Sequence, residues 1–240
     1  MLVRRSGLAL LALAVFTGPV LAGCESEGAG EATETEESAA DLLERAKQTL
    51  DDSESVHFVL SSEGAPTTGT VLVGGEGDMA RPASFDGTLQ VLALGSTLDL
   101  EVVSVDGTVY AQLPFTSGFT EIEPEQFGFG DPGELMDRET GISQLLAEAQ
   151  SAELGEERRV DGEVVREVTA ELPGDLVEQI LDSADPSQPV QARFSIAPDS
   201  GEPRRAELTG PFFEAGEDAT YTLELSDFGA DVEITAPTTG

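Results

Sequence analysis

The sequence predicts an α+β fold: a single domain in which an antiparallel sheet is covered on one face by helices. About ten segments alternate apolar and polar residues with a period of two, which is the pattern of half-buried strands. Tight turns join several of these segments directly, and this favours antiparallel pairing. A few other segments repeat apolar residues at helical spacing, and a sheet with one apolar face needs such a cover.

The first folded element is expected to be an amphipathic helix that begins near Ala39 and ends at residues 51–53. Its apolar side chains share one face, with polar residues between them. From Val56 onward the period changes from helical spacing to two, so strands follow. The helical stripe comprises Leu42, Leu43, Ala46 and Leu50.

The middle of the chain, residues 85–113, predicts three adjacent strands. Gly95 and Ser96 form the first connection, and Asp106 with Gly107 forms the second, a strong hairpin signal. The same Asp-Gly pair recurs at residues 161–162. A glycine cluster at residues 74–77 indicates a turn or a bulge where the sheet bends.

Three later segments are expected to be helical and to cover the sheet. The first begins with the cap Asp131 and the early proline Pro132, and the others span residues 142–149 and 176–181. Residues 114–130 are rich in Gly and Phe and predict a long loop. Further strands are expected at residues 160–168, 190–196, 206–208, 221–225 and 232–234.

The N-terminus predicts export and attachment to a membrane. Residues 1–23 have two arginines, a short apolar stretch and small residues, as a signal peptide does. They lead into Leu-Ala-Gly-Cys at residues 21–24, a bacterial lipobox, and Cys24 is the one cysteine in the chain. Acylation of Cys24 would hold the protein on the outer face of the bacterial plasma membrane, in the cell envelope. Residues 24–38 carry six Glu and no large apolar residue, which predicts a disordered acidic tether before a folded domain at 39–240.

The charge balance excludes several classes of function. Lys and Arg number 12 against 47 Asp and Glu, a net charge of −35, so the chain would repel nucleic acid. The single His and single Cys cannot form a structural zinc site, and common catalytic motifs are missing from the sequence. We therefore expect no enzyme activity, no cofactor and no metal site. One alternative stays open: an acidic surface interaction or cation-binding lipoprotein with a solid core and no lipid ligand.

Several segments, taken in order, resemble the LppX/LprG-type lipoproteins of actinobacteria. They are Ser-Val-His-Phe at 55–58, Val-Ser-Val-Asp-Gly-Thr-Val-Tyr at 103–110, Thr-Gly-Ile at 140–142, Val-Asp-Gly at 160–162 and Leu-Glu-Leu-Ser-Asp-Phe-Gly at 223–229. The resemblance implies a curved antiparallel sheet, a half-barrel, with helices on its concave face enclosing an apolar cavity. It also implies a protein that carries lipids or lipoglycans by their acyl chains from the plasma membrane towards the outer envelope, with a membrane exporter as a partner. We expect the protein to be a monomer.

Composition agrees with a hollow interior, although a small-residue core that packs closely is the competing interpretation. Aromatic residues make up 5% of the chain and Trp is absent, so large side chains that normally fill a core are scarce. We expect the apolar faces of one hairpin and two helices to line the cavity, and four Phe of the long loop to form its mouth. The expected cavity residues are Leu89, Val91, Ala93, Leu98, Leu100, Val102, Leu145, Leu146, Ile180 and Leu181, and the expected mouth residues are Phe115, Phe119, Phe127 and Phe129.

Overall fold

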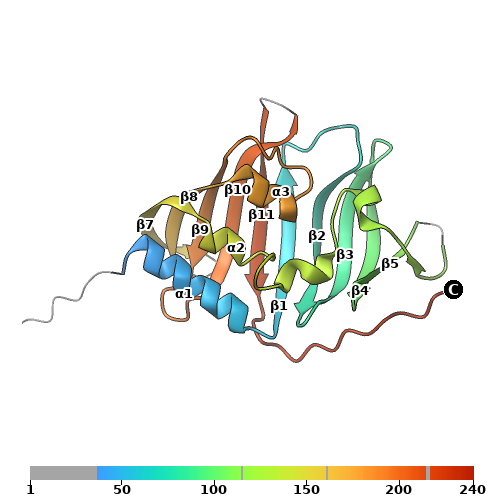
Figure 1. Ribbon diagram of the computed structural model, residues 1–240, viewed down its shortest axis with the longest axis horizontal. Coiled ribbons are helices and arrows are strands. Elements are labelled where there is room, and N and C mark those ends of the chain that lie inside the picture. Colours follow the sequence, from blue (N-terminus) through green and yellow to red (C-terminus); the bar gives the residue numbers. More distant parts are fainter. Residues whose placement is uncertain (1–36, 115, 161, 215–216) are drawn as a thin grey trace, which may run out of the picture. The chain divides into compact units, whose positions relative to one another are not determined.

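The protein folds around one open antiparallel sheet of 11 strands (Figure 1). The computed structural model describes residues 37–240 except for residues 115, 161 and 215–216. The strand order is β6-β5-β4-β3-β2-β1-β11-β10-β9-β8-β7, and the two edge strands do not pair with each other, so the sheet is not closed. The strands are β1 Ser55–Glu63, β2 Val71–Ala80, β3 Ser84–Ala93, β4 Ser96–Val105, β5 Thr108–Gln112, β6 Thr120–Glu121, β7 Gln150–Val160, β8 Glu163–Leu172, β9 Val190–Ile196, β10 Pro203–Glu214 and β11 Glu217–Ser226.

Helices cover one face of this sheet, and Figure 1 shows α1, α2 and α3 in front of that face. Two short 3-10 helices, η1 and η2, belong to the connection between β6 and α2. The predicted α+β architecture, with helices over one face of an antiparallel sheet, is therefore confirmed. The helices are α1 Ala39–Asp52, η1 Pro124–Phe127, η2 Pro132–Met136, α2 Gln144–Ala147 and α3 Gly174–Ile180.

Helix α1 begins and ends where the sequence predicts. Ser38 caps it by accepting a hydrogen bond from the backbone N–H of Asp41 at 3.2 Å, while the Asp41 carboxylate accepts one from the N–H of Ser38. This reciprocal capping box satisfies two backbone donors that the first turn leaves free. The predicted apolar stripe is buried, including Leu42 and Leu50.

The predicted turns of the central strands are present. Gly95 and Gly107 both have positive φ angles, in the β3–β4 and β4–β5 hairpins. The glycine cluster lies within β2 and does not form a turn. The register with β3 shifts between Leu72 and Gly74, so the bulge alternative is the correct one.

The structure differs from the sequence prediction in three segments. Strand β7 was not expected, because it is an edge strand with mostly exposed polar residues and two register shifts against β8. Residues 232–234 do not form a strand. Instead, the C-terminal segment runs along the strand ends (Figure 1), where Thr239 bridges Phe119. Residues 114–130 are also less irregular than expected, since they contain β6 and η1.

The core depends on a close approach between β2 and β3. Gly77 lies opposite Gly87, and a Cβ atom built on Gly87 would lie only 2.7 Å from the Gly77 Cα atom. The space above these glycines is filled by Phe58 and Phe85, whose ring centroids are 5.6 Å apart. Both rings are buried, and the missing side chain of Gly87 makes room for the pair, since a Cβ atom there would lie 2.9 Å from the Phe85 ring.

We predict that Gly87→Ala destabilises the domain strongly, whereas Gly130→Ala does not. A methyl group at Gly87 would overlap the Gly77 backbone, while one at Gly130 would meet no atom within 4 Å. The expected loss for Gly87→Ala is about 3 kcal/mol of unfolding free energy, and for Gly130→Ala less than about 0.5 kcal/mol. Urea unfolding of both variants is the measurement, and equal midpoints would contradict the packing described.

Candidate functional site

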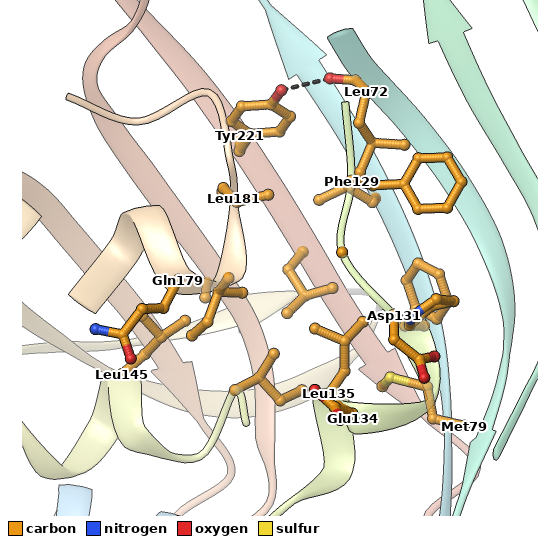
Figure 2. Close-up of a pocket in the computed structure, with 18 of the residues that line it drawn as sticks. Leu72, Met79, Phe129, Asp131, Glu134, Leu135, Leu145, Gln179, Leu181 and Tyr221 are labelled. Atoms are coloured by element: carbon orange, nitrogen blue, oxygen red, sulfur yellow. Dashed lines mark hydrogen bonds between the residues drawn. The ribbon is translucent and has the colours of Figure 1, made fainter. Parts of the chain in front are cut away.

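A pocket of about 340 Å³ lies between the middle of the sheet and the helical layer (Figure 2). Strands β1, β2, β3, β10 and β11 form its floor, while η2, α2, α3 and their flanking residues form its walls and roof. Its volume is near the lower end of the range of about 300 to 1,000 Å³ for small-molecule sites. The lining comprises Phe58, Leu60, Leu72, Met79, Leu89, Phe129, Gly130, Asp131, Pro132, Glu134, Leu135, Thr140, Ile142, Leu145, Gln179, Ile180, Leu181, Ala206, Leu208, Tyr221 and Leu223.

A cross-strand row of aliphatic side chains makes the centre of the floor. Ala206 on β10 pairs with Leu223 on β11, and Leu223 pairs with Leu60 on β1. All three line the pocket and are only half-buried, although they lie on the face that the helices cover. Helices and floor therefore do not meet here, and the aliphatic side chains face an open space.

The row continues to β3 across a glycine. Leu60 pairs with Gly75 on β2, and Gly75 pairs with Leu89 on β3. A Cβ atom on Gly75 would lie 2.8 Å from the Leu89 side chain, so Leu89 already occupies the space above this glycine. Leu89 can therefore extend over β2 and line the pocket because Gly75 has no side chain.

The segment that contains η2 is held in place by Asp131. Its carboxylate accepts hydrogen bonds from the Gly133 N–H at 2.8 Å and from the buried Ser104 hydroxyl on β4. The acidic cap and early proline predicted here are confirmed. Because Asp131 is tied to β4, the residues on either side of it, Phe129 and Leu135, are placed against the pocket (Figure 2).

The opening of the pocket is polar and carries negative charge. Gly130, Glu134, Thr140 and Gln179 line it and are exposed, so they mark its rim. Asp131 lies beside them and is half-buried. Among the described residues that line the pocket, none is Lys or Arg. The rim therefore offers oxygen acceptors and an amide but no cation.

Tyr221 closes one end of the pocket by linking two strands that are not neighbours. Its hydroxyl donates a hydrogen bond to the Leu72 carbonyl of β2, across β1 (Figure 2), and lies 3.4 Å from the Ser183 hydroxyl. The ring meets Phe212 edge to face at 5.0 Å between centroids. Burial raises the pKa of Tyr221 to about 12, because the ionised phenol would lose its hydration.

Of the residues that the sequence analysis placed in the cavity, the structure brings four together in the pocket lining. These are Leu89, Leu145, Ile180 and Leu181. Val91, Leu100, Val102 and Leu146 are buried in the packed core and do not line the pocket, and the half-buried Ala93 and Leu98 also lie outside the lining.

Of the four Phe residues expected at the mouth of the cavity, one lines the pocket. Phe129 lines the pocket, while Phe127 packs against the core beside it with ring centroids 6.4 Å apart. Phe119 is half-buried near the C-terminal segment. Phe115 lies outside the described residues, as does Cys24.

Sequence reasoning missed the centre of the floor, because the central hairpin of the sequence is not the centre of the sheet. The middle position belongs to β1 and β11, which are more than 150 residues apart in the chain. The alternation in residues 56–60 and 221–225 identifies both segments as strands and makes Phe58, Leu60, Tyr221 and Leu223 candidates for the pocket lining. Their pairing, however, cannot be read from local pattern.

No group of His, Cys, Asp and Glu in the part of the chain that the structure describes could hold a metal ion. Within the same part, no helix combines the length and apolarity needed to cross a membrane.

Comparison with known proteins assigns the chain to a family. The family described as LppX_LprAFG lipoprotein matches residues 38–234, which is most of the chain. The chain belongs to the LppX_LprAFG lipoprotein family. Among its relatives is the lipoarabinomannan carrier protein LprG of Mycolicibacterium hassiacum, 29% identical over 236 residues that cover 95% of this chain and 97% of LprG.

Solved structures support the same fold. LprF of Mycobacterium bovis superposes with a TM-score of 0.69 and 16% identity, over 84% of this chain and 97% of LprF. LppX of Mycobacterium tuberculosis gives a TM-score of 0.62 at 16% identity, over 82% of this chain and 98% of LppX. The resemblance stated from the sequence is confirmed, and the open antiparallel sheet is the fold of these lipoproteins.

We predict that Tyr221→Phe destabilises the domain and removes a specific loss of stability at alkaline pH. At neutral pH the variant should lose about 1 to 2 kcal/mol, because the Leu72 carbonyl is left without its donor. The folded-state pKa of about 12 lies above the ordinary 10.0, so Tyr221 stabilises the fold fully below pH 10 and loses that contribution between pH 10 and 12. The loss amounts to about 2 to 3 kcal/mol.

Urea unfolding across this pH window measures the effect. Tyr110→Phe is the matched control, since Tyr110 is the other tyrosine of the chain and is half-buried. Identical alkaline profiles for wild type and Tyr221→Phe would contradict the prediction.

Proposed function

We propose that this protein is a membrane-anchored lipid carrier of the bacterial cell envelope. It binds acyl chains of lipids or lipoglycans in the pocket over β1 and β11, and carries them from the plasma membrane towards the outer envelope. The half-buried row of Leu60, Leu223 and Ala206 is the observation that carries this proposal, because aliphatic side chains facing an open space suit an alkyl ligand. The name of the relative LprG, a lipoarabinomannan carrier, supports a lipoglycan as the ligand.

The rim supports a preference for headgroups without negative charge at the pocket opening. Glu134 and Asp131 would repel a phosphate held there, whereas sugar hydroxyls can donate hydrogen bonds to both carboxylates. Thr140 and Gln179 add neutral donors and acceptors to the same rim. We therefore infer that a sugar or other neutral polar group sits at the opening, with any phosphate of the ligand farther out in solvent.

Attachment to the membrane would come from acylated Cys24 and the acidic segment that follows it. Removing residues 1–23 takes away two Arg and no acid, so the net charge moves from −35 to −37. Repulsion from an anionic membrane would hold the domain away from the surface, on a tether that reaches about 20 Å. In this proposal the protein acts as a monomer without enzyme activity or cofactor, and a membrane exporter is its partner.

Mass spectrometry of an organic extract tests the carrier proposal directly. The chain without residues 1–24 is expressed in an actinobacterial host, purified without detergent and extracted with chloroform and methanol. We expect lipid at about one molecule per protein, released only on unfolding. A purified protein without stoichiometric lipid would contradict the proposal and favour the acidic interaction module instead.

We predict that Ala206→Phe blocks lipid loading while the fold persists, whereas Ala192→Phe unfolds the protein. A phenyl ring at Ala206 would extend into the pocket, which Ala206 lines. Ala192 lies on the neighbouring strand β9, is only 4% exposed and does not line the pocket, so the same ring would overpack the core. Bound lipid and melting temperature are measured for both variants. Equal loading of wild type and Ala206→Phe would contradict the placement of the ligand.

A further inference from the structure

Strand β4 is flanked by two hairpin turns with nearly equal φ angles, one with Leu and the other with Asp at its first position. At one end Leu94 and Gly95 have φ angles of 53° and 76°, and at the other Asp106 and Gly107 have 53° and 73°. Over the ten residues of β4 these turns lie about 33 Å apart. They can therefore be compared directly, as two sites with one local geometry.

The turn itself does not explain the leucine. Positive φ at the first turn position suits Asp or Asn, whose short polar side chains tolerate the left-handed region, and it is unfavourable for Leu. Leu94 is also 100% exposed, so it gains no burial within the domain that would offset this cost. Both the backbone conformation and the exposure to solvent disfavour a leucine here, so its role lies outside the domain.

The two chain segments that carry the Leu94 turn and the connection beside it contain no charged residue. Residues 64–75 and 87–98 contain no Asp, Glu, Lys or Arg, in a chain whose charged fraction is 25%. The connection between β1 and β2 lies beside the β3–β4 turn, since a Cβ atom on Gly95 would be 4.0 Å from the Thr67 carbonyl oxygen. We name residues 64–70 and 93–96 together the uncharged tip.

The uncharged tip lies at the end of strands that reach the pocket. Leu72, which lines the pocket, follows the tip on β2, and it pairs with Val91 on β3 just before the turn. Phe129 lines the same part of the pocket (Figure 2), and its neighbour Gly128 approaches the Thr70 carbonyl, with a built Cβ atom 2.9 Å away. The tip is thus continuous with the pocket lining.

We propose that the uncharged tip touches the lipid bilayer, with the Leu94 side chain inserted among the acyl chains, when the protein loads or releases lipid. This inference rests on the proposed carrier function and deepens it. An anionic membrane repels a strongly acidic protein, and the repulsion is smallest where the protein surface carries no charge. A single protruding leucine among Thr, Ser and Gly suits a bilayer better than a protein partner, because protein interfaces concentrate their energy in clustered aromatic and Arg side chains.

Site-specific fluorescence tests the contact in the acylated protein that begins at Cys24. Cys24 is the only native cysteine, and its sulfur is blocked by the lipid, so Leu94→Cys and Asp106→Cys each supply one reactive thiol. Each variant is labelled with the fluorophore NBD and reconstituted into phosphatidylcholine and phosphatidylglycerol vesicles that contain nitroxide-labelled lipid. We expect at least twofold quenching at position 94 and none at position 106. Equal quenching at the two positions would overturn the proposal.

A second pair of variants tests the role in transfer. Leu94→Asn should keep or raise the melting temperature, since Asn tolerates positive φ, yet slow the transfer of a fluorescent acyl lipid between vesicles several-fold. Asp106→Asn is the matched control and should change neither quantity. If Leu94→Asn loads lipid and transfers it at the wild-type rate, the tip proposal fails while the carrier proposal stands. If wild type takes up no lipid, the carrier proposal fails, and the quenching experiment still decides whether the tip meets the bilayer.

Discussion

The pairing of β1 with β11 is the constraint on which the rest of the structure depends. It joins the strands of the N-terminal and C-terminal halves into one sheet, through seven residue pairs from His57 with Ser226 to Glu63 with Thr220. Without it, Leu60 would not lie beside Leu223, and the row of side chains that forms the floor would not exist. Tyr221 depends on the same pairing, because its reach to Leu72 requires β1 to lie between β11 and β2.

The position of the pocket follows from where large side chains are placed. Phe58 and Phe85 fill the core above Gly77 and Gly87, and a second aromatic group surrounds Tyr221. Between them the floor has only aliphatic side chains and one glycine position, Gly75. A core is normally filled by interdigitating side chains, so a floor without aromatic rings in the middle of a wide sheet leaves space. The position of the pocket therefore depends on where the few aromatic side chains lie, as well as on their low number.

Much of the fold could be predicted from local pattern, and the centre of the site could not. The start of α1, the turns at Gly95 and Gly107, and the cap at Asp131 each depend on a few neighbouring residues, so the sequence shows them directly. Strand β7 was missed because an exposed edge strand needs no apolar alternation. The strand predicted at 232–234 is absent although its residues alternate, because this segment does not pair with another strand.

The placement of individual cavity residues depended on strand order. Val91 and Leu100 have the expected inward orientation on β3 and β4, but β4 lies outside the pocket floor and β3 contributes only Leu89 to it, so both side chains are buried in the packed core. Leu89 reaches the pocket because Gly75 beside it has no side chain. The alternation of a single strand shows which side chains point inward. Which of these side chains line the pocket depends on the order of the strands, and that order is set by long-range pairing.

The half-buried floor also has a thermodynamic consequence. A domain that keeps aliphatic groups uncovered in its interior has part of its hydrophobic stabilisation unrealised until something else covers them. Ligand occupancy and folding are then linked by mass action: at a free ligand concentration one hundred times the dissociation constant, the occupied form gains about 2.7 kcal/mol over the empty one. The empty form of such a domain is the less stable of the two, and proteases that act on transiently opened molecules would cleave it faster than the occupied form.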